Sequence, residues 1–137
     1  MARKILAVDD EKNILRLLQV HLERAGYQVV TAMDGKDAIL KIGQHKPDLI
    51  VLDVMMPQMD GFEVLRALRR NQSTRDIPVI MLTAKSQDAD VLKGWQSGVD
   101  CYLTKPFNPV ELLSFVKRIF DSMDGGPGGD SRYDISV

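Results

Sequence analysis

Short apolar runs alternate with segments of helical periodicity along most of this chain. Five of the runs have the length and the content of branched aliphatic residues that buried strands show, and turn residues bound them. We expect strands at residues 4–8, 27–31, 48–52, 77–82 and 99–103. The third run is almost continuously apolar, which is typical of a strand covered on both faces.

Between the runs, apolar residues recur at the spacing of a helix face. The last helix has the clearest start, because Asn108 is a favoured cap residue and Pro109 is favoured at the first helical position. The alternation predicts an α/β fold, a doubly wound five-stranded parallel sheet with helices on both faces. Helices are expected at residues 14–25, roughly 36–45, 62–68, about 86–97, and from Pro109 onward.

We assign residues 1–122 to one domain and residues 123–137 to a flexible tail. A chain of 137 residues suits a single core. The stretch Asp124–Asp130 holds four of the ten glycines and cannot pack a core. No DNA-binding or enzymatic output domain is expected in this chain.

Composition and charge narrow the class of protein. Apolar residues make up 45% of the chain and charged residues 27%, as in ordinary globular proteins. The formal net charge of −1 gives no reason to expect nucleic acid or a membrane surface as a partner. A single cysteine, Cys101, excludes an internal disulfide and suits a reducing compartment. Since no apolar run is long enough to cross a bilayer, we predict a cytoplasmic protein.

Polar residues follow four of the five expected strands. Asp9 and Asp10 follow the first, Asp53 the third, Thr83 the fourth, and Lys105 comes shortly after the fifth. Taken singly, each is ordinary, because Asp and Thr often cap helices and Lys is usually solvated. The carboxyl ends of parallel strands meet at one edge of a sheet, where ligands bind. We therefore expect these side chains to converge.

The chemistry of such a group favours phosphoryl transfer. Three close carboxylates repel one another unless they are protonated or bridged by a cation. Mg²⁺ suits a pocket of one or two carboxylates plus phosphate oxygens. An aspartate beside it can act as a nucleophile towards phosphorus, while an ammonium and a hydroxyl position the phosphoryl oxygens. The residues predict Asp53 as the nucleophile, assisted by Lys105 and Thr83.

Four motifs carry these residues: Val8–Glu11 (VDDE), Leu52–Gly61 (LDVMMPQMDG), Met81–Ala84 (MLTA) and Tyr102–Phe107 (YLTKPF). On these motifs the chain resembles the response-regulator receiver domains of two-component signalling, whose fold is that of the chemotaxis regulators. The resemblance covers residues 4–120. It implies a flavodoxin-like sheet with the strand order 2-1-3-4-5.

The resemblance also implies a role for each site residue. Asp53 would accept a phosphoryl group from a histidine kinase or a phosphotransfer protein. Asp10, Asp53 and the backbone carbonyl of Met55 would bind Mg²⁺ directly, and Asp9 would bind it through water. Lys105 would pair with the phosphoryl group. The protein would act as a switch that phosphorylates and dephosphorylates itself, and not as a turnover enzyme.

A second set of residues is implied to pass the signal on. Thr83 and Tyr102 would form a switch pair, in which the hydroxyl moves to the phosphate and the ring turns inward. This would change the surface built by the fourth helix, the fifth strand and the last helix. The bond between Lys105 and Pro106 would be cis.

An unknown effector protein is expected to read that surface through Val91, Trp95 and Phe115. The simpler alternative is that Trp95 and Phe115 only pack at the edge of the core. In DNA-binding relatives, the place of Phe115 often holds an arginine that forms a charged dimer contact. A monomer or a weak dimer dependent on phosphorylation is therefore expected here.

Three other classes of protein fit parts of the pattern less well. Phosphatases of the haloacid-dehalogenase type need an Asp-x-Asp motif, whereas Val54 and Met55 follow Asp53. A nucleotide-binding module would need a glycine-rich loop after the first strand, and none is present. An interaction domain without phosphorylation would not need the intact set of acidic residues, Thr83 and Lys105.

Overall fold

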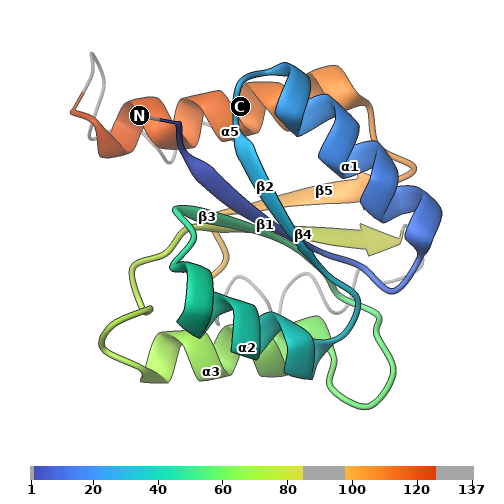
Figure 1. Cartoon of the computed structure of the whole chain (residues 1–137), viewed down its shortest axis with the longest axis vertical. Helices are drawn as coiled ribbons and strands as arrows, with labels where there is room; N and C mark the ends of the chain where they lie inside the picture. The colour runs from blue at the N-terminus through green and yellow to red at the C-terminus, as the bar shows by residue number, and fades with distance from the viewer. Residues whose placement is uncertain (1, 85–97, 126–137) are drawn as a thin grey trace.

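The computed structural model describes residues 2–84 and 98–125. Its centre is a five-stranded parallel sheet with the order β2-β1-β3-β4-β5 (Figure 1). This order confirms the predicted fold class. The strands are β1 (Lys4–Val8), β2 (Gln28–Ala32), β3 (Leu49–Asp53), β4 (Val79–Ala84) and β5 (Cys101–Lys105).

Helices cover both faces of the sheet. Helices α1 and α5 lie on one face, and α2 and α3 lie on the other (Figure 1). The described helices are α1 (Lys12–Arg24), α2 (Gly35–His45), α3 (Gly61–Arg70) and α5 (Pro109–Met123). The helix predicted at about 86–97 lies outside the described residues.

The alternation of side chains along each strand divides the core in two. Ile5 and Ala7 of β1 pack with α1 and α5 in what we call the α1–α5 core. Leu6 and Val8 pack with α2 and α3 in the α2–α3 core. Every residue of β3 is buried, as the apolar run predicted. The sheet is thus a rigid platform, and only its edges and strand ends reach solvent.

Local signals in the sequence account for the helix ends. Asp34, Asp60 and Asn108 cap α2, α3 and α5 by accepting hydrogen bonds from backbone N–H groups at 2.8, 2.9 and 2.9 Å. These bonds satisfy donors that have no partner within the helix. Gly26 follows α1 with a φ of +97°, a conformation that glycine adopts at little cost. The caps fix where each helix enters from the carboxyl edge of the sheet.

Four strands begin one or two residues later than predicted. Asp48 stays outside β3 because its carboxylate accepts a hydrogen bond from the backbone N–H of Lys4 at 2.8 Å. Pro78 stays outside β4 because it has no N–H, although its carbonyl accepts from Ile50 N at 3.0 Å. The later boundaries bring Asp53, Thr83 and Lys105 into the strands themselves. These residues are therefore held by the sheet and not by loops.

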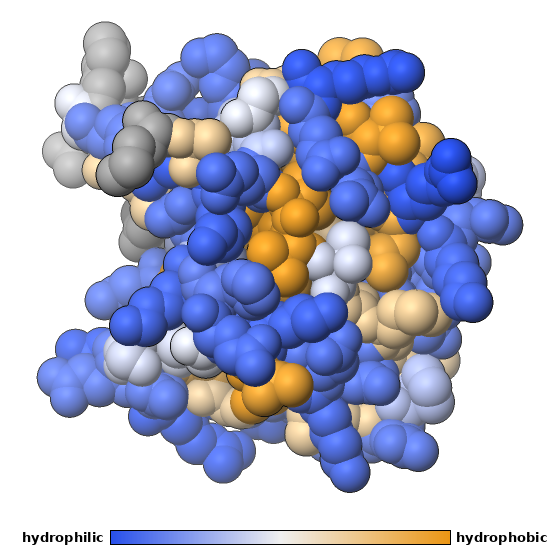
Figure 2. Space-filling view, in the orientation of Figure 1, coloured by the Kyte–Doolittle hydropathy of each residue, from blue (hydrophilic) through white to orange (hydrophobic). Residues whose placement is uncertain are grey.

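The surface is mostly hydrophilic on the side seen in Figure 2. Apolar residues gather there between the two helical layers, where the edge strand β2 lies, and Val29 and Val30 of this strand are half-buried. Within the described residues, no helix is both long and apolar enough to cross a membrane.

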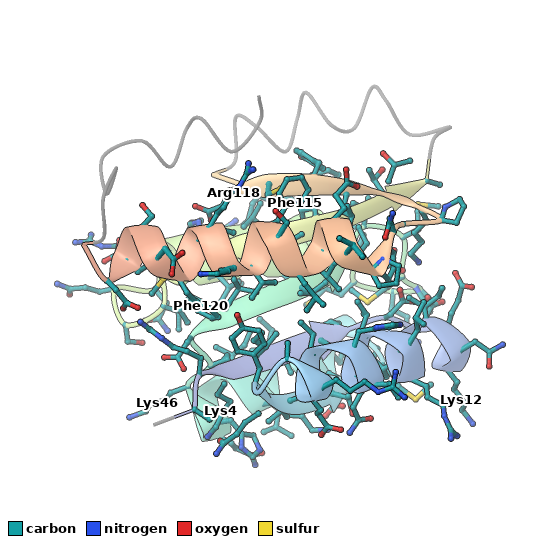
Figure 3. All side chains as sticks on the ribbon, turned by 90° about the horizontal axis from the view of Figure 1, so that it is seen from above. Lys4, Lys12, Lys46, Phe115, Arg118 and Phe120 are labelled. Atoms are coloured by element: carbon teal, nitrogen blue, oxygen red, sulfur yellow. The ribbon has the colours of Figure 1, made fainter. Side chains whose placement is uncertain are left out.

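Helix α5 has two different sides. Phe120 is buried, and its ring centroid lies 5.5 Å from that of Tyr27 and 4.9 Å from the guanidinium carbon of Arg3. Phe115 and Arg118 lie on the side away from α1 (Figure 3). On the inner side of α5, Leu112, Val116 and Ile119 are buried. Phe120 belongs to the same core.

Candidate functional site

Three of the predicted site residues share one face of the sheet at its carboxyl edge. Asp53 ends β3, Lys105 ends β5, and Asp9 directly follows β1. The residues two positions earlier in these strands all belong to the α1–α5 core, so the period of two points the three polar side chains to that same face. Those earlier residues are Ala7, Val51 and Leu103.

The ammonium group of Lys105 joins these carboxylates. Its Nζ lies 2.9 Å from Asp9 Oδ2 and 3.1 Å from Asp53 Oδ1. Asp9 is fully buried and Asp53 is 3% exposed. The bond between Lys105 and Pro106 is cis, as the resemblance implied. The predicted convergence of Asp9, Asp53 and Lys105 is therefore present in the fold.

The cluster carries more negative charge than its one ammonium offsets. Burial raises the pKa of Asp53 to about 7, the charge of Asp9 adds to this rise, and Lys105 opposes it. Burial also raises the pKa of Asp9, against the hydrogen bonds from Lys105 and from the N–H of Glu11. Burial acts against the charged form of Lys105, but the two carboxylates outweigh it, and its pKa is raised. A further cation would stabilise the ionised carboxylates.

Asp10 completes a group of oxygen ligands. Carboxylate oxygens of Asp9, Asp10 and Asp53 all lie within 4.8 Å of one another. Asp10 is exposed to solvent, unlike the other two. Mg²⁺ prefers oxygen ligands and keeps several waters, which a half-open carboxylate site allows. The donor set of this chain thus fits the predicted ion, and no second group of this kind occurs among the described residues.

Gly61 closes the loop that follows Asp53. Its N–H donates to the carbonyl of Val54 at 2.9 Å. A Cβ at position 61 would lie 2.4 Å from the backbone oxygen of Asp53, which a real side chain cannot do. In the sequence this glycine stands out only as the last residue of the Leu52–Gly61 motif. A glycine at the first position of a helix directly after a site loop is the signal that could have marked it.

The proposed switch pair lies on the other face of the sheet. Thr83 is 3% exposed, and its hydroxyl donates to the carbonyl of Ala84 at 3.3 Å. Tyr102 pairs in register with Met81, two residues before Thr83, and packs against the α2–α3 core. Thr83 lies one position beyond Leu82, the register partner of Asp53.

The predicted output face is described only in part. Phe115 is half-buried and packs against the α1–α5 core, on the side of α5 away from α1 (Figure 3). This position agrees with both the edge-of-core and the docking interpretation. Val91 and Trp95 lie outside the described residues.

The comparison with known families decides the class of this site. The family described as "Response regulator receiver domain" matches residues 5–117. The chain belongs to the response regulator receiver family. Receiver domains are phosphoacceptor switches that bind Mg²⁺ at an acidic pocket, and they interact with histidine kinases or phosphotransfer proteins. This assignment favours the receiver over the alternative classes considered from the sequence.

Two curated relatives are similar along almost the whole receiver chain. The alkaline phosphatase synthesis transcriptional regulatory protein PhoP of Bacillus subtilis is 51% identical over 135 residues, which are 98% of this chain and 55% of the relative. The DNA-binding dual master transcriptional regulator RpaA of Synechocystis is 46% identical over 96% of this chain and 55% of its own length. The chain spans about half the length of these relatives.

Solved receiver structures have the same fold. A putative response regulator from Chloroflexus aurantiacus is 34% identical with a TM-score of 0.83, covering 87% of this chain and 98% of its own. The chemotaxis protein CheY4 of Vibrio cholerae is 38% identical with a TM-score of 0.81, covering 86% and 98%.

Proposed function

We propose that the chain is a switch controlled by phosphorylation of Asp53. The phosphoryl group comes from the phosphohistidine of a histidine kinase or of a phosphotransfer protein. An oxygen of Asp53 bonds to phosphorus as the P–N bond breaks, and the imidazole keeps the electron pair. The observation that carries this proposal is the contact of the buried Asp53 with Lys105 at 3.1 Å, beside two further carboxylates.

The neighbouring side chains stabilise the transferred group. Lys105 already lies at the Asp53 carboxylate, so its ammonium is near enough to neutralise charge on the phosphoryl oxygens. The hydroxyl of Thr83, on the adjacent strand, donates to a second oxygen. Thr83 and Lys105 lie on β4 and β5, two strands packed against the core, which supports these roles.

We assign the predicted metal to the three carboxylates. Asp10, Asp53 and the backbone carbonyl of Met55 would hold Mg²⁺ directly, and Asp9 would hold it through water. When bound, the ion offsets the negative charge of the site and of the phosphoryl oxygens. Asp9 also keeps Lys105 at the site through the ion pair at 2.9 Å.

The phosphorylated state changes the surface that partners contact. The Thr83 hydroxyl turns to the phosphoryl group, and the half-buried ring of Tyr102 moves inward over the α2–α3 core. An effector protein reads the resulting change on β5 and α5, where Phe115 lies, and on Val91 and Trp95. Hydrolysis ends the signal, because water attacks phosphorus, the P–O bond to Asp53 breaks, and inorganic phosphate leaves.

Intact-mass measurement tests the phosphoacceptor. Incubation with a small-molecule phosphodonor and Mg²⁺ is expected to add about 80 Da, the mass of one phosphoryl group in an aspartyl-phosphate intermediate. The adduct is expected to be absent in Asp53→Asn and when the metal is chelated. Asp60→Asn is the matched control, because Asn preserves the cap of α3 and should keep the adduct. An adduct on Asp53→Asn would contradict the proposal.

A further inference from the structure

Lys105 has a third carboxylate partner that the proposed function does not use. Its Nζ lies 3.4 Å from Glu11 Oε1, in addition to the contacts with Asp9 and Asp53. The two aspartates are buried, whereas the side chain of Glu11 is 63% exposed. The ammonium therefore spans the boundary between the buried cluster and the solvent.

Glu11 is placed for this contact by its backbone. It is the N-cap of α1, yet its side chain makes no capping hydrogen bond. Ser, Thr, Asp and Asn are the usual residues at this position, so capping does not explain a glutamate. Its N–H donates to Asp9 Oδ1 at 2.8 Å, and its carbonyl accepts from Leu15 N at 3.0 Å. The backbone is thus fixed beside Asp9 while the longer side chain reaches Lys105.

The charges at the site indicate what the contact between Glu11 and Lys105 does. A cation held by the aspartates and the ammonium of Lys105 compete for the carboxylates of Asp9 and Asp53. Lysine carries its charge on a flexible stem of four carbons, so its Nζ can shift by a few ångströms. Glu11 offers the ammonium a partner at the rim when the cation takes over the aspartates.

We propose that Glu11 is a positioning residue for Lys105. It holds the ammonium at the rim of the site when the cation binds, and so lowers the competition between Lys105 and the metal. The inference rests on the proposed function for the metal, and it adds a residue that tunes metal binding through Lys105. Glu11 does not need to touch the cation or the phosphoryl group.

Calorimetric titration of the unphosphorylated chain with Mg²⁺ tests this role. Glu11→Gln is expected to weaken Mg²⁺ binding roughly two- to fivefold, the size typical of an exposed ion pair. Glu11→Asp keeps the charge but shortens the reach, so nearly the same loss is expected. Glu23→Gln, at the far end of α1, is the matched control and should bind as the parent does.

A double-mutant cycle separates positioning from simple charge. In a Lys105→Met background, Glu11→Gln should change Mg²⁺ affinity less than about twofold, because Glu11 acts through the ammonium. An equal loss in both backgrounds, or no loss in either, would overturn the role of Glu11. If the parent binds Mg²⁺ without such coupling, only this inference fails. A parent that binds no Mg²⁺ would overturn both this inference and the proposed metal site.

Discussion

At the scale of single residues, the most consequential feature is the environment of Asp53. The carboxylate is buried against Asp9 and has one ammonium, that of Lys105, as its described cationic partner. Burial and the neighbouring charge raise its pKa to about 7. A carboxylate with a raised pKa opposes folding once it is ionised. Ionisation of Asp53 therefore lowers the free energy of unfolding, although the proposed reaction at phosphorus uses the ionised carboxylate.

The raised pKa of Asp53 predicts that folding stability depends on pH, which can be measured without metal. Because the pKa of Asp53 in the folded chain lies above its ordinary value of 3.8, the unfolded chain loses its proton first, and stability falls as pH rises from about 4 to about 7. Asp53→Asn should reduce this fall and stabilise the chain by roughly 1 to 3 kcal/mol at pH 8. Urea unfolding at pH 5 and pH 8, in buffer that contains a chelator, measures the free energy of unfolding of both proteins.

The other charges of the site also affect how stability depends on pH. Asp9 and Asp10 add repulsion and Lys105 adds attraction, so a residual pH dependence is expected in Asp53→Asn. Asp76→Asn, which changes an exposed carboxylate outside the site, should follow the parent. An Asp53→Asn variant that loses as much stability between the two pH values as the parent would contradict the raised pKa.

At the scale of elements, the junction of β3 with α3 depends on close backbone approach. Gly61 begins α3 and lies against the carbonyl of Asp53, where no Cβ fits. The start of the helix is further fixed by the cap from Asp60 at 2.9 Å. The position of Asp53, the proposed phosphoacceptor, is thus coupled to the placement of a whole helix.

Gly61→Ala should therefore destabilise the chain by about 1 to 3 kcal/mol, the usual cost of overpacking against rigid atoms. Phosphorylation of Asp53 should slow as well, because the backbone of Asp53 must shift. Gly43→Ala in α2 is the matched control, since a Cβ there meets nothing within 4 Å. It should stabilise the chain by about 0.5 to 1 kcal/mol. Similar stabilities for the two variants in urea would refute the close approach.

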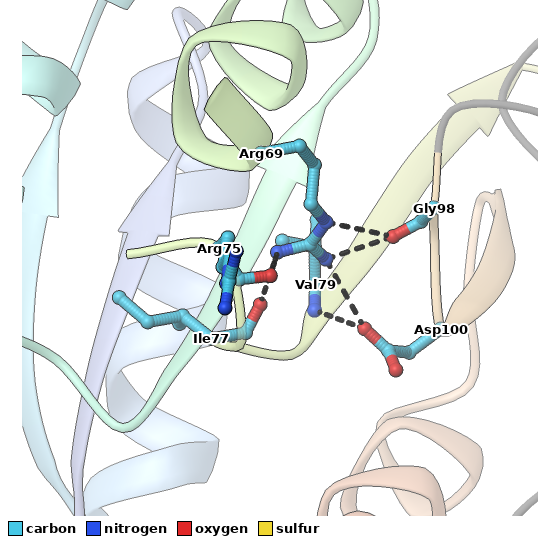
Figure 4. A network of polar contacts seen from close by, with 6 residues as sticks. All are labelled: Arg69, Arg75, Ile77, Val79, Gly98 and Asp100. Atoms are coloured by element: carbon cyan, nitrogen blue, oxygen red, sulfur yellow. Dashed lines mark hydrogen bonds and ion pairs between the residues drawn. The ribbon is translucent and has the colours of Figure 1, made fainter. Parts of the chain in front are cut away.

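At the scale of the whole molecule, Arg69 joins parts of the chain that the sheet alone does not connect. From α3 it donates to the carbonyls of Arg75, Ile77 and Gly98 at 2.9, 2.8 and 2.7 Å (Figure 4). It also pairs with Asp100 at 3.5 Å, whose carboxylate accepts from the N–H of Val79 at 2.8 Å. These contacts hold the segments that lead into β4 and β5, at the end of the sheet opposite Asp53.

Arg69→Ala should cost about 2 to 4 kcal/mol, because several carbonyls and a carboxylate lose a half-buried charged partner together. Arg69→Lys should lie between the parent and Arg69→Ala, since an ammonium cannot reproduce the fork of the guanidinium. Phosphorylation of Asp53 should continue in both variants under conditions where they remain folded. Urea unfolding checks the order, and an Arg69→Ala variant within about 0.5 kcal/mol of the parent would show that the network adds little.

Much of this molecule could be read from local patterns. Short apolar runs, turn residues and caps such as Asn108 act over a few residues. The sequence alone therefore predicted the strands, the class of fold and the edge at which Asp9, Asp53 and Lys105 meet. Strand limits were less predictable. They depend on which donors find partners across the sheet, as the side chain of Asp48 and the missing N–H of Pro78 show.

Tertiary structure alone decided the features that involve distant residues. Lys105 and Glu11 are 94 positions apart, and no periodicity connects them. The clearance at Gly61 and the contacts of Arg69 likewise arise only when helices pack on the sheet. The raised pKa of Asp53 has the same origin, because it depends on burial and on a neighbouring charge brought in by another strand. Sequence determined which groups stand at the strand ends, and packing determined the distances and the dielectric environment in which they act.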